Sequence, residues 1–331
     1  MRAISCYGVL SVVVALSLCK SASADDTTGG FLDGFKLGGY SSAYVNVHPG
    51  GKSEASLEEV SFLLRWEGEG RWRLFSELEQ EKPVSWKSGQ GFTNDGAKID
   101  LERFYFDYNI SEQYNLRAGR FLTPAGRWNL IHAAPLVWTT TRPISTSRLF
   151  PQSINGVMLY GAKSFENQAF EYTFFAEALQ DQHLDGDEIQ YRDARGGRFA
   201  FSGKLNLGLT LMEFNEAIPG SPQFRLAGVD FMVKHDDWEF SGEAFQRYYS
   251  NNRDGGSGGY LQAVAPLGNR WFAVGRVENF KRPAEGSAER WVVGTAWRFQ
   301  PNRVFKLEYV GGDEERVDAP KGLFSSFAIL F

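Results

Sequence analysis

Cysteine is almost absent from this 331-residue chain, and its two cysteines, Cys6 and Cys19, both lie near the N-terminus. The remainder of the chain cannot form a disulfide, a thiolate metal site or a cysteine nucleophile. Basic residues are outnumbered, because 35 Lys and Arg stand against 40 Asp and Glu and give a formal net charge of -5. This sign argues against a general nucleic-acid-binding protein.

Long apolar runs are also scarce, so the sequence excludes a bundle of transmembrane helices, each of which needs about 20 consecutive apolar residues. The one extended apolar stretch covers residues 7–19, between Arg2 and the small residues at 22–24. That order predicts a cleaved secretory signal peptide at residues 1–24. We expect a short periplasmic arm at residues 25–34 to follow it.

Apolar and polar residues alternate with a period of two from residue 35 onward. Residues 60–67 read VSFLLRWE and residues 291–299 read WVVGTAWRF. A period of two predicts β-strands with one apolar face and one wet face. Sixteen segments follow this pattern, at residues 35–47, 57–67, 71–80, 98–110, 114–121, 154–164, 169–180, 196–204, 208–215, 224–234, 238–249, 258–266, 270–279, 288–299, 303–312 and 322–331.

The connections between these segments alternate between short turns and long links. Turns such as 68–70, 235–237 and 300–302 have three residues, whereas the intervening links have about 8 to 32 residues. Short turns on one side and long loops on the other are typical of outer-membrane barrels. The sequence therefore predicts an all-β fold, a transmembrane antiparallel up-and-down β-barrel of about 16 strands at residues 35–331. Barrels of this size enclose an aqueous channel.

The two ends of such a sheet have to meet, because every backbone polar group must be satisfied internally within lipid. The final segment places Phe327, Ile329 and Phe331 on one face. We therefore expect this segment to pair with the first one, residues 35–47, and to close the barrel.

The longest link, residues 122–153, carries a recognisable motif. Residues 119–132 read GRFLTPAGRWNLIH. This GRFLTPxGRWNxIH pattern resembles a Gram-negative outer-membrane porin-like family, loosely that of the phosphate-selective porins, in which Phe is common at the position of Ala125. The resemblance implies a homotrimer whose third loop folds into the lumen and narrows it. It also implies outer-membrane lipid and lipopolysaccharide as surroundings, small hydrophilic or anionic solutes as cargo, and no cofactor.

The composition of this link supports an inward-folded position. Trp128, Trp138 and Phe150 are side chains that a loop extended into water does not need, so we expect the link to pack against the barrel. No Asp or Glu occurs between Glu112 and Glu166, whereas basic residues gather there. Arg stays protonated at neutral pH, and a narrow pore with low-dielectric walls focuses its field.

We therefore predict a basic pore constriction that favours anions. Its candidate residues are Arg117, Arg120, Arg127, His132, Arg142 and Arg148. Strand phase adds further lumen-facing candidates, which are Arg65, Arg73, Arg103, Arg198, Arg247, Arg276 and Arg298. Each Arg can instead form a structural ion pair with a Glu or Asp of another strand, and for every candidate this alternative stays open.

Motifs for catalysis are missing. The four histidines lie in expected loops or turns, and no G-x-S-x-G, P-loop or dinucleotide-binding pattern stands between a strand and a helix. The sequence therefore predicts neither an enzyme nor a metal centre.

A passive channel for small hydrophilic solutes with an anion preference is the function that we expect, in the outer membrane of a Gram-negative bacterium. Two alternatives stay open. One is a solute-specific channel for phosphate, a sugar or an aromatic acid, with Trp128, Trp138 and Tyr105 as contacts. The other is a non-conducting surface barrel, or adhesin, whose long loops are the functional part.

Overall fold

The computed structural model describes residues 34–331, except residues 49, 52, 69, 132, 181–188, 218–219, 221, 284–285 and 314–320. The predicted signal peptide at 1–24 and residues 25–33 of the predicted arm lie outside the described residues. In the described part of the chain, no helix is both long enough and apolar enough to cross a membrane.

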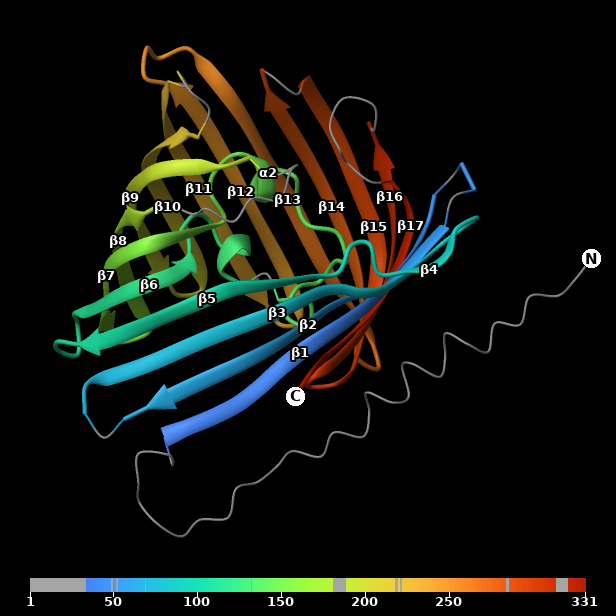
Figure 1. Ribbon diagram of the computed structural model, residues 1–331, viewed down its shortest axis with the longest axis horizontal. Helices are drawn as coiled ribbons and strands as arrows, with labels where there is room; N and C mark the ends of the chain where they lie inside the picture. Colours follow the sequence, from blue (N-terminus) through green and yellow to red (C-terminus); the bar gives the residue numbers. More distant parts are fainter. Residues whose placement is uncertain are drawn as a thin grey trace, which may run out of the picture.

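Antiparallel strands make up nearly all of the described structure (Figure 1). The strands are β1 (Phe35–Val47), β2 (Ser53–Glu67), β3 (Trp72–Lys87), β4 (Gly91–Thr93), β5 (Lys98–Asn109), β6 (Asn115–Leu122), β7 (Ser153–Phe165), β8 (Gln168–Leu179), β9 (Tyr191–Ser202), β10 (Leu205–Glu216), β11 (Gln223–His235), β12 (Trp238–Tyr249), β13 (Asp254–Gly268), β14 (Trp271–Arg282), β15 (Gly286–Gln300), β16 (Arg303–Gly312) and β17 (Gly322–Leu330). Two short helices, η3 (Trp128–Leu130) and α2 (Ser145–Arg148), lie between β6 and β7.

The strands form one closed wall in which each strand pairs with its neighbours in the sequence. The sheet has 17 strands, of which β4 pairs only with β3, and β3 pairs directly with β5. Without β4, 16 strands remain in the wall. The predicted fold is therefore confirmed, and the short β4 is an addition that the sequence pattern did not indicate.

The first and last strands close the barrel. Ala43 pairs with Phe327 and Ser41 pairs with Ile329 across β1 and β17. Beyond the end of β17, Phe331 and Gly39 exchange two backbone hydrogen bonds of 2.8 Å each. This pairing leaves no open sheet edge at the seam, as a barrel in lipid requires.

The two faces of the wall differ in the way that the period of two predicts. On β10, Leu207 and Leu209 point outward with exposed fractions of 48% and 41%, whereas Thr210 and Met212 are buried on the inner side. Other strands repeat the pattern, so the outer surface is largely apolar. Such a surface matches the apolar band that membrane barrels present to lipid.

Strand ends on the long-loop side extend beyond the predicted segments. β3 continues to Lys87 instead of ending near residue 80, and β13 begins at Asp254 instead of residue 258. The physical reason is that these extensions contain charged residues or glycine, which interrupt the alternation on which the prediction depends. The hydrogen-bonded ladder continues there nevertheless.

Candidate channel constriction

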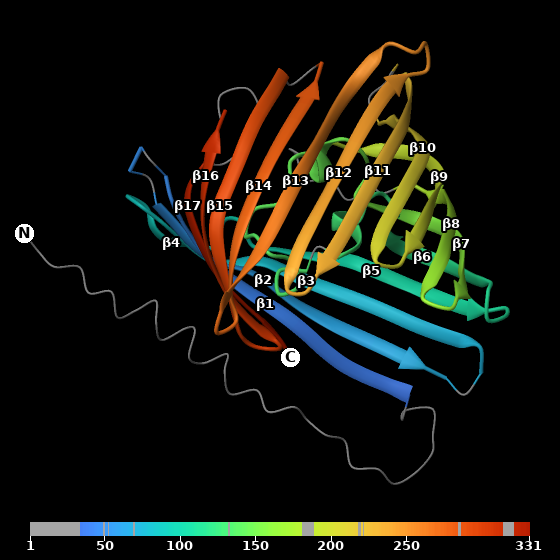
Figure 2. The ribbon, with the colours of Figure 1, turned by 180° about the vertical axis from the view of Figure 1, so that it is seen from behind.

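The third loop, defined here as residues 123–152, leaves β6 and returns to β7 through the interior of the ring of strands (Figures 1 and 2). Phe150 is fully buried, and its ring centroid lies 5.0 Å from that of Phe245 on β12. The ring of Trp138 lies 4.9 Å from that of Phe272 on β14. The expectation that this loop packs against the barrel is confirmed. Burial of apolar surface, at about 25 cal/mol for each Å², stabilises its position.

Three carboxylates of the barrel wall hold the backbone N–H groups of the third loop. They are Glu243 on β12, Glu278 on β14 and Glu308 on β16, and all three are at least nine-tenths buried. Backbone N–H groups buried outside regular structure need such acceptors. The donors are Arg127 and Trp128 to Glu243, Thr140 and Thr141 to Glu308, and Ile144 to Glu278, at N–O distances from 2.6 to 3.0 Å.

Gly126 makes the close approach of the loop to Glu243 possible. Its φ of 65° lies in the left-handed region, and a Cβ atom at this position would lie 2.0 Å from Oε2 of Glu243. Its own N–H group donates to the hydroxyl of Thr210 at 3.3 Å. The glycine of the motif is therefore required both by the backbone conformation and by the available space.

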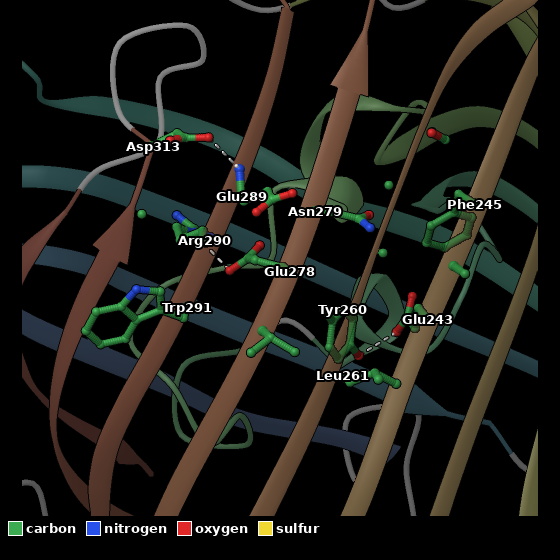
Figure 3. Close-up of a pocket in the computed structure, with 16 residues that line it drawn as sticks. Glu243, Phe245, Tyr260, Leu261, Glu278, Asn279, Glu289, Arg290, Trp291 and Asp313 are labelled. Atoms are coloured by element: carbon green, nitrogen blue, oxygen red, sulfur yellow. Dashed lines mark hydrogen bonds and ion pairs between the residues drawn. The ribbon is translucent and has the colours of Figure 1, made fainter.

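Basic side chains of β14, β15 and β16 hold the loop through its carbonyl groups. Arg276 donates to the carbonyl of Thr141, Arg298 to that of Pro135 and Lys306 to that of Ala134, at 2.9, 3.0 and 2.7 Å. Figure 3 shows part of this wall, where Arg290 donates to Glu278 and Tyr260 donates to Glu243 beside a cavity of about 910 Å³. Arg276 and Arg298 thus face the lumen, and both help to anchor the loop.

Several of the predicted candidates form ion pairs with carboxylates of their own strand, of a neighbouring strand or of the next strand but one. Arg117 donates from Nε and Nη2 to the two carboxylate oxygens of Asp107 at 2.8 and 2.9 Å, and its guanidinium lies 3.6 Å from the ring centroid of Tyr105. The other pairs are Arg65 and Arg73 with Glu67, Arg103 with Glu77, Arg198 with Asp230, Arg247 with Glu216 and Arg276 with Glu278. In these seven residues the structure contains the ion pairs that the sequence left open as the alternative to a selectivity role.

Arg127 and Arg142 differ from this group, because neither forms an ion pair with a residue that the structure describes. Arg142 donates to Oδ1 of Asn129 at 2.7 Å and to the carbonyl of Thr146 at 2.9 Å, both within the loop. Burial lowers the pKa of Arg142 to about 10, and nearby carboxylates act in the opposite direction, so its side chain stays protonated at neutral pH. Nη2 of Arg127 lies 3.3 Å from the sulfur of Met232.

The remaining constriction candidates lie near the ends of the loop or outside the described residues. Arg120 is on β6, and Arg148 is the last residue of α2, where its carbonyl accepts a hydrogen bond of 3.2 Å from the hydroxyl of Tyr191. His132 lies outside the described residues. An influence of any of these residues on ion selectivity stays a prediction.

Carboxylates gather on a different part of the wall, across the lumen from β12 to β14 (Figure 1). This acidic strip, on β2, β3 and β5, consists of Glu59, Glu77, Glu79, Glu81, Asp100 and Glu102. Three of its members accept hydrogen bonds from hydroxyl groups, Glu59 from Ser42 at 2.8 Å, Glu77 from Tyr40 at 2.7 Å and Glu79 from Ser61 at 2.8 Å. Sequence reasoning treated such residues only as partners for Arg. The signal was present in β3, where residues 77, 79 and 81 share one phase and are all Glu.

Metal binding finds no support in the described residues. Within them, no group of three or more His, Cys, Asp or Glu side chains is placed so that it could hold a metal ion. The same holds for the acidic strip.

Comparison with known proteins places the fold. No protein-family model matches the chain. An uncharacterized protein of Aquifex aeolicus (strain VF5) is 23% identical over 225 residues, which are 63% of this chain, and the chain spans only 50% of that relative.

Solved structures give closer matches in shape. An anion-selective porin from Comamonas acidovorans has a TM-score of 0.57 and 14% identity, with 89% of this chain and 97% of that chain covered. OmpF of Salmonella typhi, in complex with daunomycin, has a TM-score of 0.62 and 11% identity, with 91% and 99% covered. OmpT of Vibrio cholerae, an outer-membrane protein in trimer form, has a TM-score of 0.60 and 7% identity, with 90% and 99% covered. At these identities the likeness establishes one point, that the chain has the fold of outer-membrane porins.

Proposed function

We propose that this chain forms a water-filled outer-membrane channel for the passive diffusion of small hydrophilic solutes, with a preference for anions. A closed wall of 16 strands is wide enough to enclose water, and the third loop occupies part of that space. The fold likeness to porins supports the same role.

The charge of the third loop is the observation that carries the anion preference. Residues 123–152 contain Arg127, Arg142 and Arg148 and no Asp or Glu. The guanidinium groups of Arg127 and Arg142 form no ion pair with a described residue, so their charge is not directly neutralised by a carboxylate of the described part of the chain. Charged groups that line a pore set its ion preference.

The wall carboxylates oppose this charge, but hydrogen bonds from the loop backbone offset part of their effect. Glu243, Glu278 and Glu308 accept hydrogen bonds from the loop backbone and are buried behind it. The acidic strip on β2, β3 and β5 favours cations, but the ion pairs of Arg103 with Glu77 and of Lys98 with Asp100 reduce its net negative charge. The loop fills part of the lumen, so its cations lie beside the path that remains.

Zero-current potentials test this proposal directly. The purified full chain is inserted into planar bilayers between two KCl solutions of different concentration, and the sign of the potential gives the preferred ion. Arg127→Met should reduce the ratio of Cl⁻ to K⁺ permeability by about fourfold, since a unit charge about 10 Å away interacts by about 0.4 kcal/mol in water, with opposite sign for the two ions. The matched control is Arg225→Met, which removes an exposed positive charge from β11. Cation preference in the wild type contradicts the proposal, and so does an equal effect of both variants.

A homotrimer and export through the cleaved leader belong to the same proposal. The trimer form of the Vibrio cholerae OmpT structure, which has a similar fold, supports a trimer. Native mass spectrometry of the detergent-solubilised protein should give three copies. N-terminal sequencing of protein from the outer-membrane fraction should begin at Asp25.

A further inference from the structure

A separate cavity lies between the third loop and the turn-side ends of β11, β12, β13 and β15. Its volume is about 380 Å³, which is within the range of small-molecule sites in proteins. The loop contributes Arg127, Trp128 and Trp138, among other residues, and the wall contributes Lys234 and Gln262, among others. Of these lining residues, only Arg127 also contributes to the anion preference proposed above.

The charge of the cavity is positive. Its basic lining residues are Arg127, Lys234 and Arg298, and its one acidic lining residue is Glu239. The carboxylate of Glu239 already has two partners. It accepts a hydrogen bond of 3.0 Å from the indole N–H of Trp138, and it forms an ion pair with Lys234 at 3.0 Å. The single carboxylate therefore leaves two cationic groups in excess, which favours an anionic ligand.

Apolar side chains line the loop side of the cavity. Ile131 and Leu136 have exposed fractions of 44% and 52%, which is unusual for side chains inside a packed barrel. Trp138 lies beside them, with the guanidinium of Arg298 at 4.3 Å from its ring centroid. Apolar surface of this kind favours a ligand with a compact apolar body.

The third feature of the cavity is the buried side-chain amide of Gln262. It lines the cavity, and its side chain is only 5% exposed. Its Oε1 atom accepts no hydrogen bond from any described residue. A buried amide oxygen without a donor costs free energy, and a ligand hydroxyl group can donate a hydrogen bond to it.

We propose that this cavity is a binding subsite for small ring carboxylates that carry a hydroxyl group. The carboxylate lies toward Arg127 and Arg298, the ring contacts Ile131 and Leu136, and the hydroxyl group bonds to the amide of Gln262. The proposal rests on the channel function proposed above and adds the solute class that the channel retains beside its third loop.

Calorimetric titration of the detergent-solubilised full chain with 4-hydroxybenzoate, benzoate and phenol tests the subsite. We expect 4-hydroxybenzoate to bind about tenfold more tightly than benzoate, because one hydrogen bond to a buried partner contributes about 1.4 kcal/mol. Gln262→Leu should lower the affinity for 4-hydroxybenzoate to that for benzoate and leave benzoate within about twofold. Arg127→Met should weaken both acids about tenfold, and phenol should bind weakly to every variant.

A matched control and a second variant keep the result decisive. Gln80→Leu makes the same change on β3, where the Gln80 amide bonds to the carbonyl of Lys98 instead of facing the cavity, and it should leave all affinities unchanged. Gln262→Met is used if Gln262→Leu does not give a folded barrel by circular dichroism. Equal binding of 4-hydroxybenzoate to the wild type and the Gln262 variant overturns the proposal. The absence of saturable binding to the wild type also overturns it, and so does stronger binding of glucose than of either acid. The titration needs no ion current, so it can succeed or fail independently of the zero-current measurement.

Discussion

Removal of the Glu308 carboxylate should loosen the third loop. Glu308 is 3% exposed and accepts the N–H groups of Thr140 and Thr141 at 2.8 Å each. The change Glu308→Ala leaves both donors buried without this acceptor. The anchors at Glu243 and Glu278 remain, and so do the hydrogen bonds from Arg276 to Thr141 and from Lys306 to Ala134, so we expect the middle of the loop to detach more often while its ends stay in place.

The size of the effect follows from these two hydrogen bonds. A hydrogen bond to a charged group contributes about 1.5–3 kcal/mol, so the pair contributes about 3 kcal/mol or more. A loss of about 2.8 kcal/mol changes an equilibrium constant about 100-fold. The detached state of the loop should therefore become about 100-fold more populated in Glu308→Ala, and less so in Glu308→Gln, which retains one acceptor oxygen.

Single-channel recording measures this change. Glu308→Ala should show a larger and noisier conductance than the wild type, with Glu308→Gln between the two. Glu289→Ala is the matched control, because Glu289 is an exposed residue of the neighbouring strand β15. A conductance in Glu308→Ala that equals that of the wild type and of the control would refute the role assigned to the wall carboxylates.

Two further predictions follow from other contacts of the site. Gly126→Ala should destabilise the loop by about 1–3 kcal/mol, because φ is 65° there and the new Cβ would lie 2.0 Å from Glu243. Single-channel noise should therefore rise. Currents as quiet as those of the wild type would contradict the requirement for glycine at this position. Asp107→Asn should lower the free energy of unfolding by about 3 kcal/mol, because it leaves the guanidinium of Arg117 without its bidentate partner; an unchanged thermal unfolding midpoint in detergent would count against that ion pair.

The fold was largely predictable because a period of two survives wherever one strand face meets lipid and the other meets the lumen. The closure of β17 on β1 followed from the same pattern together with the rule that no strand edge is left open in lipid. What the pattern missed were the extended strand ends and β4, where charged residues, proline or glycine interrupt the alternation.

The candidate site was less predictable, because strand phase gives the face of a residue but not its partner. Phase placed Arg276 and Arg298 toward the lumen, but their contacts with the loop carbonyls depend on how a 30-residue segment packs. The choice between a paired and an unpaired Arg depends on single neighbours such as Asp107, ten positions from Arg117 and directly across the β5–β6 hairpin. Three Glu residues in one phase of β3 indicated part of the acidic strip. Strand phase did not show that carboxylates of β2 and β5 lie beside them.

The central claim is that the closed barrel has a bore that conducts ions past the third loop. Its most direct test is the stepwise insertion of purified full chain into a planar bilayer in symmetrical KCl at a fixed voltage. The account predicts discrete current steps of uniform size from protein that circular dichroism shows to be folded as β-structure. Folded protein that inserts without any current steps would contradict the account and favour a non-conducting surface barrel.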